Sequence, residues 1–270
     1  MQVLTLTPKE GTFNLSIELD DINPANIVKS GQKDCKDLPV LEGSKRWSLG
    51  ELFDISGTVA SNPAEQKIVF KNSSSLFKGI GKKLSEGKIQ VQGDAGSFLG
   101  SEMTGGKITV HGNVGQYVGM EMKDGSIEVD GDAGNYLGAA YWGNWEGMTG
   151  GKIVVNGGVG HECGPWMKGG LIEIKGRAGD FLGIHMTGEK ATIVTGGTGI
   201  RAGGEMITGR IIVLSPATIL PTFKKNPDPV KEVEITADNK LSGPFDLYEG
   251  DFAEQKRPKI PRGQIFVKGK

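Results

Sequence analysis

The feature that most constrains this chain is an internal repeat with a period of 19 residues. Its template is Ile-x-Val-x-Gly-x-x-Gly-x-x-x-Gly-x-x-Met. Copies begin at Ile89, Ile108, Ile127, Ile153, Ile172 and Ala191, the sixth with one added residue. A worn copy precedes them from Ile68 to Gly79, and a partial copy begins at Ile211. Such units bury their apolar faces against their neighbours, so the repeat sets the architecture.

Within each copy, apolar residues alternate with other residues at period two, which predicts strands. No part of the repeat reads as a crossover helix. The pattern is typical of an all-β solenoid with coils about 4.8 Å apart. We predict a single-stranded, parallel, right-handed β-helix of about six to seven coils.

Glycine accounts for 44 of the 270 residues, and with only 12 prolines the excess does not indicate collagen. Glycines at fixed offsets are expected to supply positive φ at tight corners. At Gly115 and Gly134 the corner is expected to need either positive φ or close approach of the backbone. These structural corner glycines are Gly93, Gly96, Gly100, Gly112, Gly115, Gly119, Gly131, Gly134, Gly138, Gly157, Gly160, Gly164, Gly176, Gly179 and Gly183.

Columns of the repeat indicate which side chains face the core. The Ile and Val columns should stack inward, and so should the column that contains Leu99 and Cys163. Another inward column consists of Met103, Met122, Met148, Met167, Met186 and Met206. Methionine suits an irregular corner of a thin core, which favours packing over sulfur ligation.

One further column consists of Phe98, Tyr117, Tyr136 and Phe181 and is interrupted by Glu162 and Arg201. It precedes an inward column by one residue, so these aromatic rings should face outward as a stacked ladder. An exposed apolar ladder suggests cover, either by this chain's C-terminal tail or by a partner subunit.

The third copy, from Ile127 to Ile153, carries seven extra residues centred on Ala139–Trp145. Insertions in solenoids map to loops on one face, and aromatic residues are frequent binding hot spots. Tyr141, Trp142, Trp145 and Trp166, with the aromatic column, are therefore candidates for partner contact. The alternative is a loop that folds down onto its own coils.

The sequence contains no catalytic or ligand-binding motif that stands out from the repeat. The net charge of −1 gives no reason to expect nucleic acid or an anionic membrane as a partner, and the two cysteines are too few for a cluster. The three histidines, His111, His161 and His185, lie in different columns. Neither a phosphate loop nor a catalytic triad stands out. Without a signal peptide or a long apolar run, we expect a soluble cytoplasmic protein. Because no catalytic or ligand-binding motif stands out, we expect no catalytic, cofactor or metal site on this chain.

Residues 1–66 are expected to cap the β-helix of residues 67–214. Leu4–Leu6 and Phe13–Ile17 read as an antiparallel pair, and Asn23-Pro24 reads as the start of a helix. Residues 215–270 form a tail expected to run outside the coils, on the helix or on partners, with a final strand-like piece at 264–267.

The repeat with its leading Gly-Gly-Lys resembles the Gly-rich β-helix of the C-terminal domain of glutamate synthase. The insertion, residues 138–148, is similar to the signature of the C subunits of formylmethanofuran dehydrogenase. Residues 49–53, Tyr248–Asp251 and 263–267 are also similar, so the resemblance covers essentially the whole chain.

The resemblance implies a scaffold subunit without a catalytic site, in a complex that reduces CO2 to formate and condenses it with methanofuran, the first step of methanogenesis from CO2. It implies tungsten- or molybdenum-pterin, iron–sulfur clusters and zinc on other subunits. The implied partners are a pterin-metal subunit, an amidohydrolase-like subunit, small subunits and ferredoxin-like subunits.

Three alternatives stay open on these residues. The C subunit of the related formyltransferase/hydrolase complex shares the motifs. A free-standing enzyme of the glutamate synthase type would need amidotransferase and flavin domains, for which 270 residues leave no room. A left-handed β-helix acyltransferase would have a hexapeptide repeat.

Overall fold

A computed structural model describes residues 1–11, 15–250 and 262–269. Its helices are α1 (Pro24–Asp34), α2 (Leu49–Leu52) and the 3-10 turns η1 (Cys35–Asp37) and η2 (Pro63–Glu65). The strands are β1 (Gln2–Pro8), β2 (Ile17–Glu18), β3 (Pro39–Glu42), β4 (Lys45–Ser48), β5 (Phe53–Gly57), β6 (Gln66–Ser73), β7 (Phe77–Lys78), β8 (Lys88–Gly93), β9 (Thr104–Val110), β10 (Asp124–Val129), β11 (Lys152–Val155), β12 (Gly169–Arg177), β13 (Lys190–Gly197), β14 (Arg210–Val213), β15 (Lys224–Lys225), β16 (Val230–Thr236), β17 (Asn239–Gly250) and β18 (Gly263–Lys268).

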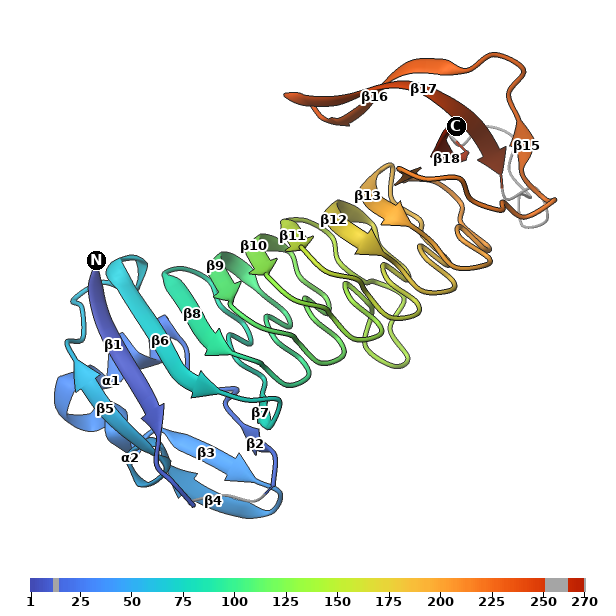
Figure 1. The fold of residues 1–270 in the computed structure, drawn as a ribbon. Coiled ribbons are helices and arrows are strands. Elements are labelled where there is room, and N and C mark those ends of the chain that lie inside the picture. Colours follow the sequence, from blue (N-terminus) through green and yellow to red (C-terminus); the bar gives the residue numbers. More distant parts are fainter. Residues whose placement is uncertain (12–14, 251–261, 270) are drawn as a thin grey trace.

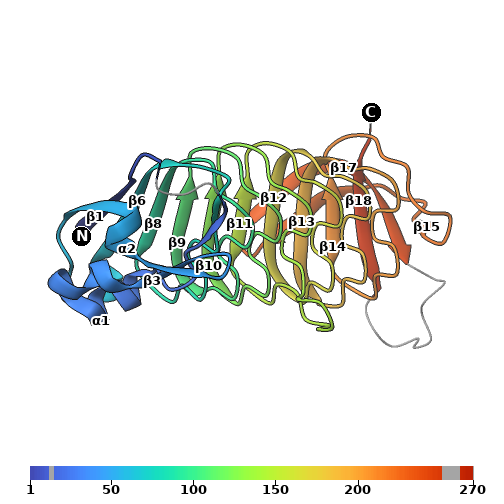
Figure 2. The same ribbon diagram turned by 90° about the horizontal axis from the view of Figure 1, so that it is seen from below.

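A large parallel sheet dominates the described residues. Successive turns of the chain contribute β6, β8, β9, β10, β11, β12, β13 and β14 in sequence order, so the molecule is a rod of stacked coils (Figure 1, Figure 2). The strands keep the register of the repeat: Ile89 pairs with Ile108, Ile108 with Ile127, and Ile153 with Ile172. This arrangement is consistent with the predicted β-helix.

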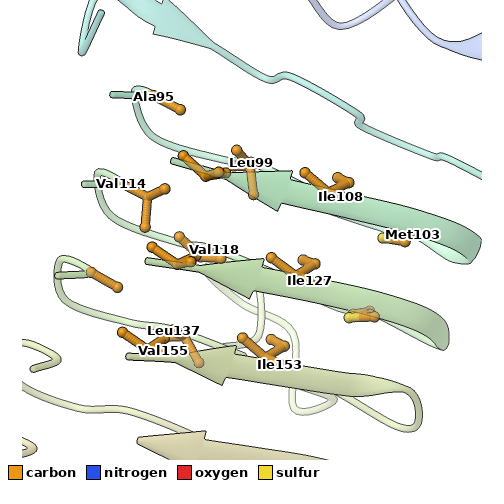
Figure 3. Close-up of a cluster of buried hydrophobic side chains, with 14 of the residues drawn as sticks. Ala95, Leu99, Met103, Ile108, Val114, Val118, Ile127, Leu137, Ile153 and Val155 are labelled. Atoms are coloured by element: carbon orange, nitrogen blue, oxygen red, sulfur yellow. The ribbon is translucent and has the colours of Figure 1, made fainter. Parts of the chain in front are cut away.

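The core of the rod is made of the predicted inward columns (Figure 3). The Ile and Val columns are buried from coil to coil, and so are Leu99, Val118, Leu137 and Cys163. The six methionines of the Met column are each 0% exposed. The worn first copy is confirmed, because Ile68 pairs with Ile89 and Phe70 with Val91.

The sixth copy is displaced by two residues from its predicted register. Ile193, rather than Ala191, pairs with Ile172, and Thr195 stands opposite Ile174. A slip of two residues keeps every side chain on the same face of a strand, so the alternating pattern cannot detect it. Thr195 is buried, and its hydroxyl donates a hydrogen bond to the carbonyl of Gly197 (2.6 Å).

The corner glycines fall into two physical classes, one with positive φ and one without it. The third glycine of each copy has positive φ, as at Gly119 (φ 61°), where a Cβ would lie 2.4 Å from Ile153 Cδ1. The middle glycines, such as Gly115, lack positive φ, but a Cβ there would lie 2.7 Å from the amide nitrogen of Ser97. Close approach of adjacent coils, the alternative expected at Gly115 and Gly134, therefore explains the middle column. Positive φ is also absent, against expectation, from the first glycines Gly112, Gly131, Gly157 and Gly176.

The N-terminal region adds a further strand to the stack. β1 pairs in parallel with β6, placing Leu4 beside Ile68, and antiparallel with β5. The predicted antiparallel pairing of β1 with the segment ending at Ile17 is wrong, because β2 pairs with β3 and β7 instead. Phe13 of that prediction lies outside the described residues. The predicted helix start is confirmed: the Asn23 side chain accepts a hydrogen bond from the Asn26 amide (3.0 Å).

The C-terminal region continues the stack as well as covering it. β18 pairs in parallel with β14, so Ile265 and Val267 extend the core columns, and the expectation that this piece runs outside the coils was wrong. The hairpin of β16 and β17 folds over the outer face of the sheet, where its buried apolar residues Val233, Ile235, Phe245 and Leu247 pack on Leu171, Val194, Ile212 and Phe266. Asp251, quoted in the family resemblance, lies outside the described residues.

Candidate functional site: an aromatic ladder and its insertion

The outward aromatic column is built on an unusual backbone conformation. Phe98, Tyr117, Tyr136 and Phe181 all have φ between 61° and 67°, a left-handed region that bulky residues rarely adopt. This conformation turns each amide along the rod: the N–H of Tyr117 donates to the carbonyl of Asn135 (3.0 Å), and that of Tyr136 to His161 (3.0 Å). Hydrogen bonds to the next coil therefore compensate for a backbone that costs about 1 kcal/mol or more per residue.

Three rings of this column stack as predicted. The ring centroids of Phe98 and Tyr117 are 5.1 Å apart and those of Tyr117 and Tyr136 are 4.9 Å apart, both nearly parallel. These distances follow from the coil spacing of about 4.8 Å, so the scaffold positions the rings. Phe181 stands apart from the stack, with the Arg201 guanidinium 5.2 Å from its ring centroid.

The two ends of the insertion are hydrogen-bonded to each other where the insertion leaves the rod. The Met148 amide donates to the carbonyl of Gly138 (2.9 Å), so the coil resumes where it was interrupted and Met148 stays in the core. A single carboxylate oxygen of Glu121, one coil earlier, accepts hydrogen bonds from the Tyr141 amide (2.9 Å) and the Asn144 side chain (2.8 Å). The Trp142 indole donates to the Tyr117 hydroxyl (3.0 Å). The insertion is thereby folded down onto its own coils.

Although it is anchored, the insertion presents its large side chains to solvent. Tyr141 is 58% exposed, Trp142 79% and Trp145 65%. Trp145 contacts Trp166 edge to face (4.7 Å between centroids), and Trp166 stacks on His185 (4.4 Å). The ladder therefore gains its contact within this chain from the insertion, while the described tail residues cover the outer face of the sheet.

Between the insertion and the ladder lies an open groove of about 260 Å³. Many of its lining residues are aromatic, among them Tyr136, Trp142, Trp145 and Trp166, and Glu162 also lines it. Sequence analysis singled out the aromatic members but gave no role to Glu121, Asn144 or Glu162. The one available signal was that Glu162 interrupts an otherwise aromatic column.

The titratable groups do not assemble a reactive or metal-binding centre in the part of the chain that the structure describes. His111 pairs with Asp130 (2.7 Å), whereas His185 pairs with Glu205 (3.2 Å) on another column. Burial raises the pKa of the Cys163 thiol well above its usual range, so it stays protonated. Across residues 1–11, 15–250 and 262–269, no three His, Cys, Asp or Glu side chains are placed to hold a metal.

Comparisons with known proteins give a consistent result. The chain is 49% identical over 266 residues to the C subunit of the tungsten-containing formylmethanofuran dehydrogenase 2 of Methanococcus maripaludis, covering 96% of this chain and 94% of that protein. It is 34% identical over 96 residues to the C subunit of the molybdenum-containing formylmethanofuran dehydrogenase 1 of Methanosarcina barkeri, covering 36% and 32% of the two chains. No family model matches the sequence.

One solved structure matches the whole fold. It is a chain in the crystal structure of the formyltransferase/hydrolase complex from Methylorubrum extorquens in complex with methylofuran. The two chains superimpose with a TM-score of 0.83 and 28% sequence identity, covering 98% of this chain and 100% of that one.

A tungsten or molybdenum centre, which the names of these relatives mention, does not fit the described residues of this chain. The two cysteines, Cys35 and Cys163, are both buried and come from different parts of the rod. Nor do the helices among the described residues offer a segment with the length and apolarity needed to cross a membrane.

Proposed function

This chain belongs to the family of formylmethanofuran dehydrogenase C subunits, and from that premise we propose that it is a structural subunit of a formylmethanofuran dehydrogenase complex. The observation that carries the proposal is the identity of 49% over 96% of the chain. The complex would reduce CO2 to formate and condense it with methanofuran. In this proposal the chain is a rigid bracket, and the tungsten- or molybdenum-pterin, iron–sulfur and zinc sites belong to other subunits in the cytoplasm.

The rod suits a bracket for a physical reason. Each coil is hydrogen-bonded to its neighbours along the sheet and again at its corners, so the two ends of the rod are held at a fixed separation. We propose that the rod is a right-handed β-helix of six to seven coils with a 19-residue repeat over residues 67–214, capped by residues 1–66 and followed by the tail of residues 215–270.

The surface proposed to contact other subunits is the insertion together with the aromatic ladder. Trp142 and Trp145 are the strongest candidates, because solvent-exposed tryptophans on an anchored loop bind with little loss of conformational freedom. The other proposed contact residues are Phe98, Tyr117, Tyr136, Tyr141, Trp166 and Phe181. The anchoring by Glu121 supports this role, since it fixes the loop on the rod while Trp142 and Trp145 stay exposed to solvent.

The test is to purify the tagged chain from its native cells under mild conditions and to identify the accompanying chains by mass spectrometry. We expect a pterin-metal subunit and an amidohydrolase-like subunit in fixed ratio with it. Elution of the chain alone, at its own mass, would contradict the proposal.

The second candidate is the C subunit of a formyltransferase/hydrolase complex, which the full-length structural match favours. The same purification separates the two candidates. Tungsten or molybdenum in the purified complex supports the dehydrogenase. A complex that lacks both metals and transfers formyl groups supports the second candidate.

A further inference from the structure

The groove between the insertion and the ladder contains a charge that its surroundings do not neutralise. Glu162 takes the place of an aromatic residue in the ladder column, between Tyr136 and Phe181, with the same left-handed backbone (φ 52°). Its amide donates to the carbonyl of Asp180 (2.9 Å), so its backbone is fixed like those of its aromatic neighbours. Glu162 is thereby placed in the lining of an aromatic groove.

Within the described residues, the Glu162 carboxylate has neither a hydrogen bond nor an ion pair. Its side chain is half-buried, and the other described residues lining the groove carry no charge. The carboxylate raises the pKa of the Tyr136 phenol, which agrees with its position beside that ring. Among the described residues, the carboxylate therefore stands between aromatic walls without a partner of opposite charge.

The same column shows how this fold accommodates a cation. One coil beyond Phe181 stands Arg201, and its guanidinium lies over the Phe181 ring. A guanidinium is planar, stacks on aromatic faces and forms two parallel hydrogen bonds with a carboxylate. The groove supplies both requirements, because Glu162 is a free carboxylate and Tyr136, Trp145 and Trp166 are adjacent rings.

We propose that this groove receives an arginine side chain of a partner subunit, whose guanidinium pairs with Glu162 and packs against the surrounding rings. The inference rests on the proposed function, since it names the chemistry by which the insertion face recognises its partner. The negative charge of Glu162 favours a cationic side chain in the groove. An apolar side chain would leave the carboxylate buried and unpaired, and an acidic one would repel it.

The test compares Glu162→Gln with the matched control Glu86→Gln in the purified complex. Glu86 is exposed and stands at a turn remote in sequence from the insertion, so the control removes one charge outside the groove. Dissociation of the complex is followed at increasing salt. Glu162→Gln should accelerate dissociation roughly 10-fold, Glu162→Lys should accelerate it further, and Glu86→Gln should match the wild type.

A second measurement separates recognition from folding. In the isolated chain, Glu162→Gln should leave the melting temperature unchanged, because the substitution breaks no hydrogen bond or ion pair of the side chain among the described residues. Faster dissociation of the complex with an unchanged free chain cannot arise from misfolding. Equal dissociation rates for wild type and Glu162→Gln would overturn the proposal of a bound arginine. If replacing Trp142 and Trp145 still abolished assembly, the proposed function would stand without it.

Two other outcomes identify a different occupant and also overturn the proposal. Carbodiimide joins a carboxylate to a lysine amine but not to a guanidinium, so an isopeptide between Glu162 and a partner lysine would exclude arginine. A homodimer of the isolated chain that Glu162→Gln dissociates would show that a second copy of this chain fills the groove.

Discussion

The regular coils and the coil that carries the insertion differ in where their large side chains lie. In a regular coil, such as the one from Ile108 to Met122, the aromatic Tyr117 is half-buried and the core residues are fully buried. The interrupted coil keeps the same core, with Met148 in place, but adds Trp142 and Trp145 at 79% and 65% exposure. The same scaffold therefore carries a surface that it does not need for its own stability.

This difference separates two kinds of constraint. In regular coils, each residue is constrained by the coils above and below it, which contact it at about 4.8 Å. In the insertion, constraint comes from a few side-chain hydrogen bonds, chiefly those accepted by Glu121 and Tyr117. Substitutions in the coils should therefore change folding, and substitutions in the insertion should change association.

The largest effect is expected from a comparison of two positive-φ glycines, one at a packed corner of a coil and one in open space in the insertion. Gly119 and Gly143 both have positive φ, but a Cβ at Gly119 would lie 2.4 Å from Ile153 Cδ1, whereas nothing lies within 4 Å at Gly143. We expect Gly119→Ala to lower the free energy of unfolding by about 4 kcal/mol and Gly143→Ala by about 1 kcal/mol. Denaturant unfolding checks both values, and equal losses would remove the distinction between the two regions.

An intermediate effect, on assembly alone, is expected from the aromatic residues of the insertion. The combined substitution Tyr141→Ala, Trp142→Ala and Trp145→Ala should weaken assembly by about 2 kcal/mol or more, roughly 30-fold, while the melting temperature changes little. Leu41, which is 39% exposed and lies in β3 of the N-terminal region, provides the control Leu41→Ala, which should leave assembly unchanged. Undiminished co-purification of the triple variant would count against a contact role.

The smallest effect concerns the anchor of the insertion. Glu121→Ala removes the acceptor of the Tyr141 amide, so hydrogen exchange at that amide should accelerate about fivefold. Glu102 occupies the same column one coil earlier and pairs with Lys83 (3.5 Å), so Glu102→Ala should leave the exchange of Tyr141 unchanged. If Glu121→Ala also leaves hydrogen exchange at the Tyr141 amide unchanged, contacts other than Glu121 hold the loop.

The contrast between the two regions also explains what could be read from the sequence. Columns such as Met103 to Met206 were predictable because a repeat multiplies each signal, and every coil reports the same inward face. The stacked ladder of Phe98, Tyr117 and Tyr136 followed from its offset relative to Leu99 and its equivalents.

Other features left no such signal. The two-residue displacement at Ile193 preserves the period-two pattern. The pairing of β18 with β14 joins segments about 50 residues apart, and no repeat links them. The left-handed backbone of the aromatic column was equally hidden, because aromatic residues do not ordinarily indicate positive φ. The roles of Glu121 and Glu162 depend on contacts between coils that a single occurrence in the sequence cannot reveal.

The contact between the insertion and a partner subunit is tested most directly by hydroxyl-radical footprinting of the tryptophans, in the free chain and in the native complex. Trp142 and Trp145 are exposed in the free chain, whereas Trp47 lies in the N-terminal sheet, outside the proposed contact surface, and serves as an internal reference. If the insertion contacts a partner subunit, assembly should suppress oxidation of Trp142 and Trp145 severalfold relative to Trp47. Equal oxidation of Trp142 and Trp145 in the free chain and in the complex would contradict it.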